Sequence, residues 1–282
     1  MSHMSPCVRR RVSLSALVFS ALLLTAAPAL AQKDCGEDGS GFQSWLSRFK
    51  ASASTYGISQ RTLARGLDGV TYDPSIIRLD RNQKSFKLTF EEFYARRAGP
   101  ALIKRGAGLM KKHADVLRRV EREFGVPAAV IVSIWGLETN YGSDKGGKMS
   151  IVRSVATLAY DCRRPEFFHK ELVGALQIIE KGDMSPAEMV GGWAGEIGQT
   201  QFLPSAYVKY GVDYDGDGRR DLVHSIPDVL ASTAKFLKEH GWQKGVGWLP
   251  GEPNYSVIKD WNKAEVYART IAVMSTKLNE MR

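Results

Sequence analysis

Apolar residues recur at three- and four-residue steps along much of the chain, which is the spacing that gathers them on one face of an α-helix. Series of this kind occupy residues 102–124, 165–181, 228–240 and 264–278. Gly182 directly follows the second series, at a position that commonly ends a helix. Strict alternation of apolar and polar residues, which would indicate strands, is scarce. The pattern therefore predicts a mainly α protein with little sheet.

A different pattern occurs at residues 128–137, which carry no charge. Pro127 precedes this run at a position suited to the first turn of a helix, so a buried helix is expected. Its last turn places Glu138, the only acidic residue of the segment 135–142, in a cleft. A carboxyl group there is costly to ionise, so its pKa rises and it can donate a proton near neutral pH. The alternative is a surface glutamate that merely ends a core helix.

The first 31 residues have the composition of an export signal. Arginines at 9–11 precede an apolar stretch at 12–24, and small residues follow at 29–31. This order is typical of a secretory signal peptide, and the apolar stretch is too short to span a membrane. We therefore expect residues 1–31 to be a signal peptide. The mature protein is expected to lie in the periplasm, to lack a membrane span and to be monomeric.

Two cysteines, Cys35 and Cys162, remain once such a signal peptide is removed. In an oxidising compartment an even pair is a candidate disulfide, whereas two unrelated buried thiols are the alternative.

The net charge of the chain is +9, of which the arginines at 9–11 contribute three. The remaining basic residues are scattered, and the export signal argues against nucleic acid as the partner. An exported basic protein is better suited to an anionic polymer, such as a peptidoglycan wall that bears carboxylates.

Helical periodicity and abundant arginine and lysine favour an N-terminal helical domain at residues 32–120. From 121 to 282 the chain alternates helices with glycine-rich loops. With 44% hydrophobic residues the composition supports a sizeable core.

The segment 191–204 combines four glycines with aromatic and amide side chains, among them Gln201 and Phe202. Glycines let the backbone approach a ligand closely, and aromatic and amide groups suit the stacking and hydrogen bonding of sugars. The spacing does not match a phosphate-binding loop. A tight structural loop is the alternative.

Residues 213–221 resemble the start of an EF-hand calcium loop, with oxygen donors at positions 1, 3, 5 and 9 and Gly218 at position 6. His224 replaces the usual glutamate at position 12, and Asp228, at a plausible helix start, could close a longer loop. A structural Ca²⁺ or Na⁺ is expected, with a solvated acidic turn as the alternative. Because such an ion has no open position for substrate, no cofactor is expected in catalysis.

Arg163 and Arg164 stand just before the helix predicted at 165–181. They could pair with substrate carboxylates, or they could form ion pairs with the neighbouring Asp161 and Glu166.

Taken together, the segments 136–142, 158–164, 193–204 and 213–228 resemble the lytic transglycosylase B family of bacterial murein-cleaving enzymes. The resemblance covers most of the chain beyond the signal peptide. It implies a goose-lysozyme-like catalytic core at 121–282, flanked by the additional helical domain and containing an EF-hand-like loop at 213–228.

The resemblance also implies an activity, the cleavage of the β-1,4 bond between N-acetylmuramic acid and N-acetylglucosamine in peptidoglycan glycan strands, with a 1,6-anhydromuramoyl end as product. It assigns Glu138 as the single catalytic acid/base. Positions that line saccharide or peptide subsites are matched by Arg163, Arg164, Gln201, Asn262 and Tyr267. The cation ligands are matched by Asp213, Asp215, Asp217, the Arg219 carbonyl and Asp228.

The sequence departs from some relatives at three positions. Gly192 stands where some have a serine, Phe236 stands where a tyrosine is found, and Glu196 stands where some have an alanine. Two other functions are kept open: a hydrolytic muramidase in which Glu196 activates water as a second carboxylate, and a non-catalytic peptidoglycan-binding protein.

Overall fold

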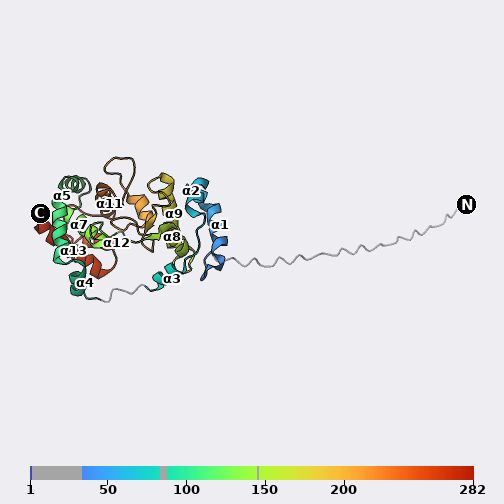
Figure 1. Ribbon diagram of the computed structural model, residues 1–282, viewed down its shortest axis with the longest axis horizontal. Helices are drawn as coiled ribbons and strands as arrows, with labels where there is room; N and C mark the ends of the chain where they lie inside the picture. The colour runs from blue at the N-terminus through green and yellow to red at the C-terminus, as the bar shows by residue number, and fades with distance from the viewer. Residues whose placement is uncertain (2–33, 83–87, 145) are drawn as a thin grey trace. The chain divides into compact units, whose positions relative to one another are not determined.

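The computed structural model describes Met1 and residues 34–82, 88–144 and 146–282 (Figure 1). Thirteen α-helices and one two-stranded sheet are present in these residues, which confirms the predicted mainly α fold. Asp34–Arg282 forms one compact unit. The predicted signal peptide lies outside the described residues apart from Met1. None of the described helices combines the length and apolarity that a membrane crossing needs.

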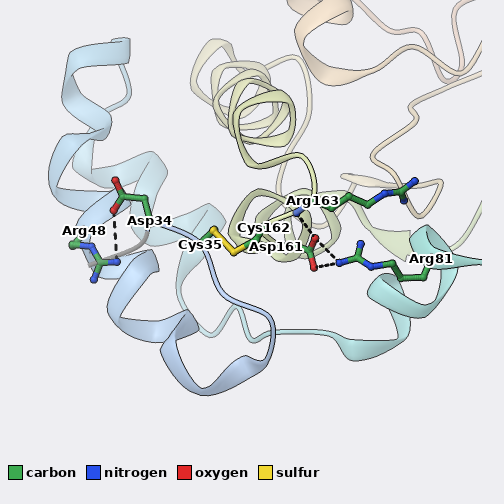
Figure 2. Close-up of a disulfide and its surroundings, with 7 residues drawn as sticks. All are labelled: Asp34, Cys35, Arg48, Arg81, Asp161, Cys162 and Arg163. Atoms are coloured by element: carbon green, nitrogen blue, oxygen red, sulfur yellow. Dashed lines mark hydrogen bonds and ion pairs between the residues drawn. A yellow bond between two sulfur atoms is a disulfide. The ribbon is translucent and has the colours of Figure 1, made fainter. Parts of the chain in front are cut away.

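The first group of helices packs on a central pair of helices. This group contains α1 (Phe42–Ser52), α2 (Gln60–Leu67) and α3 (Pro74–Arg81), with short 3-10 helices at Gly39–Gly41 and Ala53–Tyr56. Its partners are α8 (Ile151–Tyr160) and α9 (Pro165–Lys181). The predicted disulfide is present: Cys35 bonds Cys162, 127 residues away, at the turn between α8 and α9 (Figure 2). This bond fixes the start of the compact unit to the central pair.

The second group surrounds α7 (Ala128–Thr139), which packs against α5 (Pro100–Lys112), α6 (Ala114–Phe124), α11 (Ile226–Glu239) and α13 (Glu265–Glu280). Because these helices cover it on several sides, every residue of α7 except Glu138 is buried. Helix α4 (Phe90–Arg97) packs on α13. The division into domains at residue 120 stays a prediction.

The apolar series at 102–124 is helical, as predicted, but it is divided between two helices, α5 and α6. His113 leaves helical geometry, with φ −106° and ψ 25°. Its backbone N–H bonds the Leu109 carbonyl and its carbonyl accepts from the Leu117 N–H, so both helix ends are satisfied at one residue. The break lets α6 pack against α11, while α5 packs against α13.

The remaining elements are short. They are β1 (Met149–Ser150), β2 (Val190–Gly191), α10 (Pro204–Tyr210) and α12 (Tyr255–Trp261). The two strands pair antiparallel, with Met149 opposite Gly191. Helix α9 spans the predicted residues and ends at Gly182 in the left-handed conformation.

Candidate active site

Helix α7 ends in a turn that holds Glu138 at the edge of the core. Asn140 and Tyr141, with φ of 48° and 57°, adopt left-handed conformations directly after the helix. The Thr139 hydroxyl donates to the Gln199 carbonyl at 2.5 Å and accepts from the Gly142 N–H at 3.0 Å. The last turn of α7 is thereby fastened to the glycine-rich loop, so the Glu138 backbone has a fixed position relative to that loop.

The Glu138 carboxyl is half-buried, and its environment favours the protonated form. Burial raises its pKa above the ordinary value of 4.5. The Trp261 indole N–H donates to Oε1 at 3.0 Å. This bond, the Tyr267 hydroxyl and the charge of Arg97 oppose the rise without cancelling it. The result is a carboxyl that holds its proton to a higher pH than an exposed glutamate does.

Glu138 lies in a cleft of about 500 Å³ between the end of α7, the glycine-rich loop and α12. The predicted residues that line it together are Glu138, Arg164, Gln201, Phe202 and Asn262. Trp261 and Phe236 add aromatic walls, and the Trp261 ring meets those of Phe202 and Phe236 edge-on at 5.3 and 4.9 Å. The cleft therefore offers flat apolar surfaces, amides and one proton donor, a combination suited to a saccharide.

Tyr267 does not line this cleft but is buried behind Glu138, on α13. Burial and the neighbouring Glu138 charge raise its pKa well above the ordinary value, so the phenol remains protonated.

The glycine-rich loop is held open by backbone geometry that side chains would disturb. Gln201 has φ 54°, and its side-chain amide donates to the Gly198 carbonyl at 2.8 Å. A Cβ at Gly198 would lie 2.2 Å from the Leu222 carbonyl oxygen. Gln199, which the sequence did not single out, accepts from the Trp135 indole and donates to the Val223 carbonyl. Gln199 therefore supports the loop, whereas Gln201 faces the cleft.

Glu196 shares the cleft with Glu138. Its carboxylate accepts the Ala194 N–H at 3.0 Å and has no cationic partner among the described residues. Burial raises its pKa, and its charge in turn contributes to the raised pKa of Glu138. A Cβ at Gly192 would lie 2.1 Å from Glu196 Oε2, so the glycine makes room for this carboxyl.

Arg163 and Arg164 bind a carboxylate that the sequence did not indicate. Arg163 Nη1 and Arg164 Nη2 contact Asp80 of α3 at 2.6 and 2.5 Å. Asp80 is only 1% exposed. Burial opposes its ionisation, but the hydrogen bonds from the two arginines outweigh this effect and lower its pKa.

The alternative of side-chain ion pairs between these arginines and Asp161 or Glu166 does not occur among the described residues. Asp161 forms its ion pair with Arg81. From Arg163 it accepts a hydrogen bond of the backbone N–H and none of the side chain (Figure 2). The physical reason is the packing of α3 on α8, which brings Asp80 and Arg81 to the turn where Arg163 and Arg164 stand.

The acidic loop brings three of its predicted ligands together. One carboxylate oxygen from each of Asp213, Asp215 and Asp217 lies within 4.8 Å of the others, and these are the donors that a hard cation prefers. Asp228 is fully buried, and its carboxylate accepts the N–H groups of Tyr214 and Asp221 at 2.7 and 2.8 Å. Asp228 thus braces the loop from inside. The Arg219 carbonyl and Asp228 stay predicted ligands.

Comparison with known proteins identifies the fold and the family of this chain. The model of the family described as the transglycosylase SLT domain matches residues 41–251. The chain belongs to this family. The resemblance to lytic transglycosylases drawn from the motifs is therefore confirmed.

Individual relatives agree with this family. Membrane-bound lytic murein transglycosylase B of Escherichia coli (strain K12) is 36% identical over 163 residues, which are 55% of this chain and 45% of that protein. SltB3 from Pseudomonas aeruginosa, solved in complex with NAG-NAM-pentapeptide, has a TM-score of 0.79 and 31% identity over 86% of this chain and 80% of its own. The soluble lytic transglycosylase SltB1 from the same organism has a TM-score of 0.76 and 26% identity, over 83% and 98% of the two chains.

Proposed function

We propose that the protein is a peptidoglycan lytic transglycosylase in which Glu138 is the single general acid and base. The observation that carries this proposal is the position of Glu138, a carboxyl with a raised pKa in a cleft of aromatic and amide side chains. Membership of the transglycosylase family supports the reaction class. The complex of SltB3 with NAG-NAM-pentapeptide supports the substrate class.

In the first step, protonated Glu138 donates its proton to the glycosidic oxygen between N-acetylmuramic acid and N-acetylglucosamine. The bond from this oxygen to C1 of muramic acid breaks through an oxocarbenium-like transition state. The N-acetyl group of muramic acid supports the cation, as in substrate-assisted glycosidases. The leaving saccharide departs with a free hydroxyl, and Glu138 becomes a carboxylate.

In the second step, the Glu138 carboxylate takes the proton of the C6 hydroxyl of the same muramic acid, and the C6 oxygen bonds to C1. The product is a 1,6-anhydromuramoyl end, and Glu138 is protonated again. The scheme needs one carboxyl only. Binding that excludes water from C1 favours the internal hydroxyl over hydrolysis.

The neighbouring side chains have distinct roles in this scheme. The rings of Phe202 and Trp261 provide the walls against which sugars pack, and Gln201 and Asn262 provide hydrogen bonds. The Trp261 N–H also fixes one Glu138 oxygen, which leaves the other to exchange protons with the substrate.

The mass of the products tests this proposal. Digestion of purified peptidoglycan should yield muropeptides with anhydro ends, each lighter than the hydrolysis product by one water. Reducing muramic ends as the main product would contradict it.

Hydrolysis is the second candidate, because Glu196 lines the same cleft as Glu138 and carries no ion pair among the described residues. An inverting hydrolase needs its two carboxyl groups about 6.5–9.5 Å apart so that a water fits between substrate and base. Under this alternative Glu196→Gln abolishes activity, whereas a transglycosylase with one acid/base retains it.

We place the protein in the periplasm as a monomer that binds glycan strands. The signal-like order of residues 1–31 and the disulfide between Cys35 and Cys162 support an oxidising compartment. The carboxylates of Asp213, Asp215 and Asp217 would hold a structural Ca²⁺ or Na⁺. A cation that binds there would raise the melting temperature without entering the reaction.

A further inference from the structure

A second hollow of about 590 Å³ also has Glu138 in its lining. It is lined by the C-terminal end of α4, the first turns of α5 and the turn that follows α7. Glu138 is the residue that lines both this hollow and the aromatic cleft. A polymer that is cut at Glu138 extends in both directions from the scissile bond. Its two arms therefore meet two different surfaces.

This second surface is basic. Arg96, Arg97 and Arg105 line it, and all three side chains are exposed. The acidic residues among its lining are Glu138 itself and the exposed Asp144. With Glu138 protonated, as the first step of the reaction requires, the hollow keeps a net positive charge.

The arginines are oriented by neutral acceptors, so their charges are not cancelled. Arg97 donates to the Leu137 carbonyl at 2.5 Å. Arg105 donates to Asn140 Oδ1 at 3.1 Å and to Ser143 Oγ at 2.7 Å. Arg96 makes no ion pair in the described part of the chain. This contrasts with Arg163 and Arg164, whose charges are met by the buried Asp80.

We propose that this hollow, lined by Arg96, Arg97 and Arg105, binds the carboxylates of the stem peptide carried by the saccharide on that side of the scissile bond. The inference rests on the proposed function, which makes peptide-bearing peptidoglycan the substrate. A guanidinium group presents paired N–H donors that match the two oxygens of a carboxylate, and a planar, always charged group suits recognition of peptide termini. Arg97 and Arg105 stabilise the surface of the hollow through their hydrogen bonds. Arg96, which forms no ion pair in the described part of the chain, contacts the peptide carboxylate.

The proposal assigns substrate preference to the helices before α7. A muramic acid without peptide keeps the carboxylate of its lactyl group close to the sugar ring, whereas a stem peptide carries its carboxylates farther from the ring. The hollow therefore distinguishes strands by where their carboxylates lie relative to the scissile bond. A strand with amidated peptides loses the guanidinium contacts and keeps the contacts of the aromatic cleft.

The test uses two synthetic tetrasaccharides with the same stem peptides, one with free peptide carboxylates and one with these groups converted to primary amides. For the substrate with free carboxylates, Arg96→Ala should reduce kcat/KM about fivefold, mainly by raising KM, which is the size expected for an exposed charge pair. For the amide substrate, the same variant should leave kcat/KM unchanged. Arg96→Lys should restore part of the loss. Arg65→Ala, an exposed arginine of α2 away from the cleft, is the matched control.

Binding to the full-length Glu138→Gln variant, with and without Arg96→Ala, gives a readout that does not depend on turnover. A preference of this variant for the carboxylate substrate that disappears with Arg96→Ala supports the proposal. Equal affinity for both substrates, or an equal effect of Arg65→Ala, overturns it. Failure of the wild type to form anhydro ends on either substrate would instead contradict the proposed function and leave the binding result to decide this inference.

Discussion

The two surfaces that meet at Glu138 differ in chemistry, although one helix end supplies the carboxyl to both. On one side, Phe202 and Trp261 present rings and Gln201 presents an amide. On the other, Arg96, Arg97 and Arg105 present positive charge. Burial raises the pKa of Glu138, while the charge of Arg97 lowers it. The proton affinity of the catalytic carboxyl is therefore set at the boundary between the two surfaces.

The largest expected effect comes from Glu138→Gln. Glutamine keeps the size and shape of the side chain between the two surfaces, but it cannot exchange a proton with the substrate. Peptidoglycan lysis should fall by about 10²–10⁴-fold, the usual contribution of general acid–base catalysis, or below detection. Turbidity loss of purified sacculi measures this directly. Glu239→Gln, on the exposed end of α11, is the matched control and should lyse like the wild type.

The same variant should be more stable than the wild type at neutral pH. The folded-state pKa of Glu138 is raised, so between the unfolded value near 4.5 and the folded value the native state binds the extra proton and stability falls as pH rises. Glutamine does not pay this ionisation penalty. The melting temperatures of the two proteins should agree at pH 4 and separate at pH 8, and a lower melting temperature for Glu138→Gln at pH 8 would contradict the burial argument.

The next prediction concerns the buried carboxylate of Asp80, which binds Arg163 and Arg164. Asp80→Asn removes the buried charge that Arg81, Arg163 and Arg164 share, and it should lower the free energy of unfolding by about 1–2 kcal/mol, because charge-assisted hydrogen bonds are lost while the partly exposed arginines stay in contact with water. Urea denaturation measures the change. Asp68→Asn, whose exposed carboxylate pairs with Lys50, should change stability by about 0.5 kcal/mol or less. Equal effects would mean that the Asp80 cluster is not a structural anchor.

A smaller effect is expected from Trp261→Phe, which keeps an aromatic wall but removes the N–H that bonds Glu138. Since this hydrogen bond lowers the pKa of Glu138, its loss should raise that pKa and move the alkaline limb of the activity profile to higher pH. Activity at the optimum should fall about fivefold, corresponding to one hydrogen bond of about 1 kcal/mol. Trp248→Phe, whose indole bonds α13, is the control and should leave the alkaline limb in place.

The smallest effect is expected from Glu196→Gln. Its charge adds to the raised pKa of Glu138, so the amide should lower that pKa and shift the alkaline limb toward lower pH. The activity at acidic pH should be nearly unchanged, because Glu138 is then protonated in both proteins. Loss of activity at every pH would instead assign Glu196 a chemical role and favour hydrolysis.

Features carried by neighbouring residues were readable from the sequence. The uncharged run at 128–137 predicted α7 and the placement of Glu138 at its end, and the apolar series with Gly182 predicted α9. The even number of cysteines predicted the disulfide. In each case the signal is local or rests on a simple count.

Features that depend on packing between distant segments were not readable. Asp80 meets Arg163 and Arg164 only because α3 packs on α8, more than 80 residues along the chain. Arg96 and Arg105 approach Glu138 only because α4 and α5 pack around α7 and α13. Periodicity also gave no sign of the break at His113, because the apolar spacing continues across it. A residue type and its spacing do not reveal which distant surface it will face.

The most direct test of a single acid/base at Glu138 is the digestion of peptidoglycan in water enriched in heavy oxygen. If the C6 hydroxyl of muramic acid attacks C1, the new ends are anhydro and contain no oxygen from the solvent, so the mass spectrum of the products is the same as in ordinary water. Heavy oxygen at C1 of the cleaved muramic acid in most products would mean that water attacks, and it would contradict the role given to Glu138 as both acid and base of a transglycosylation.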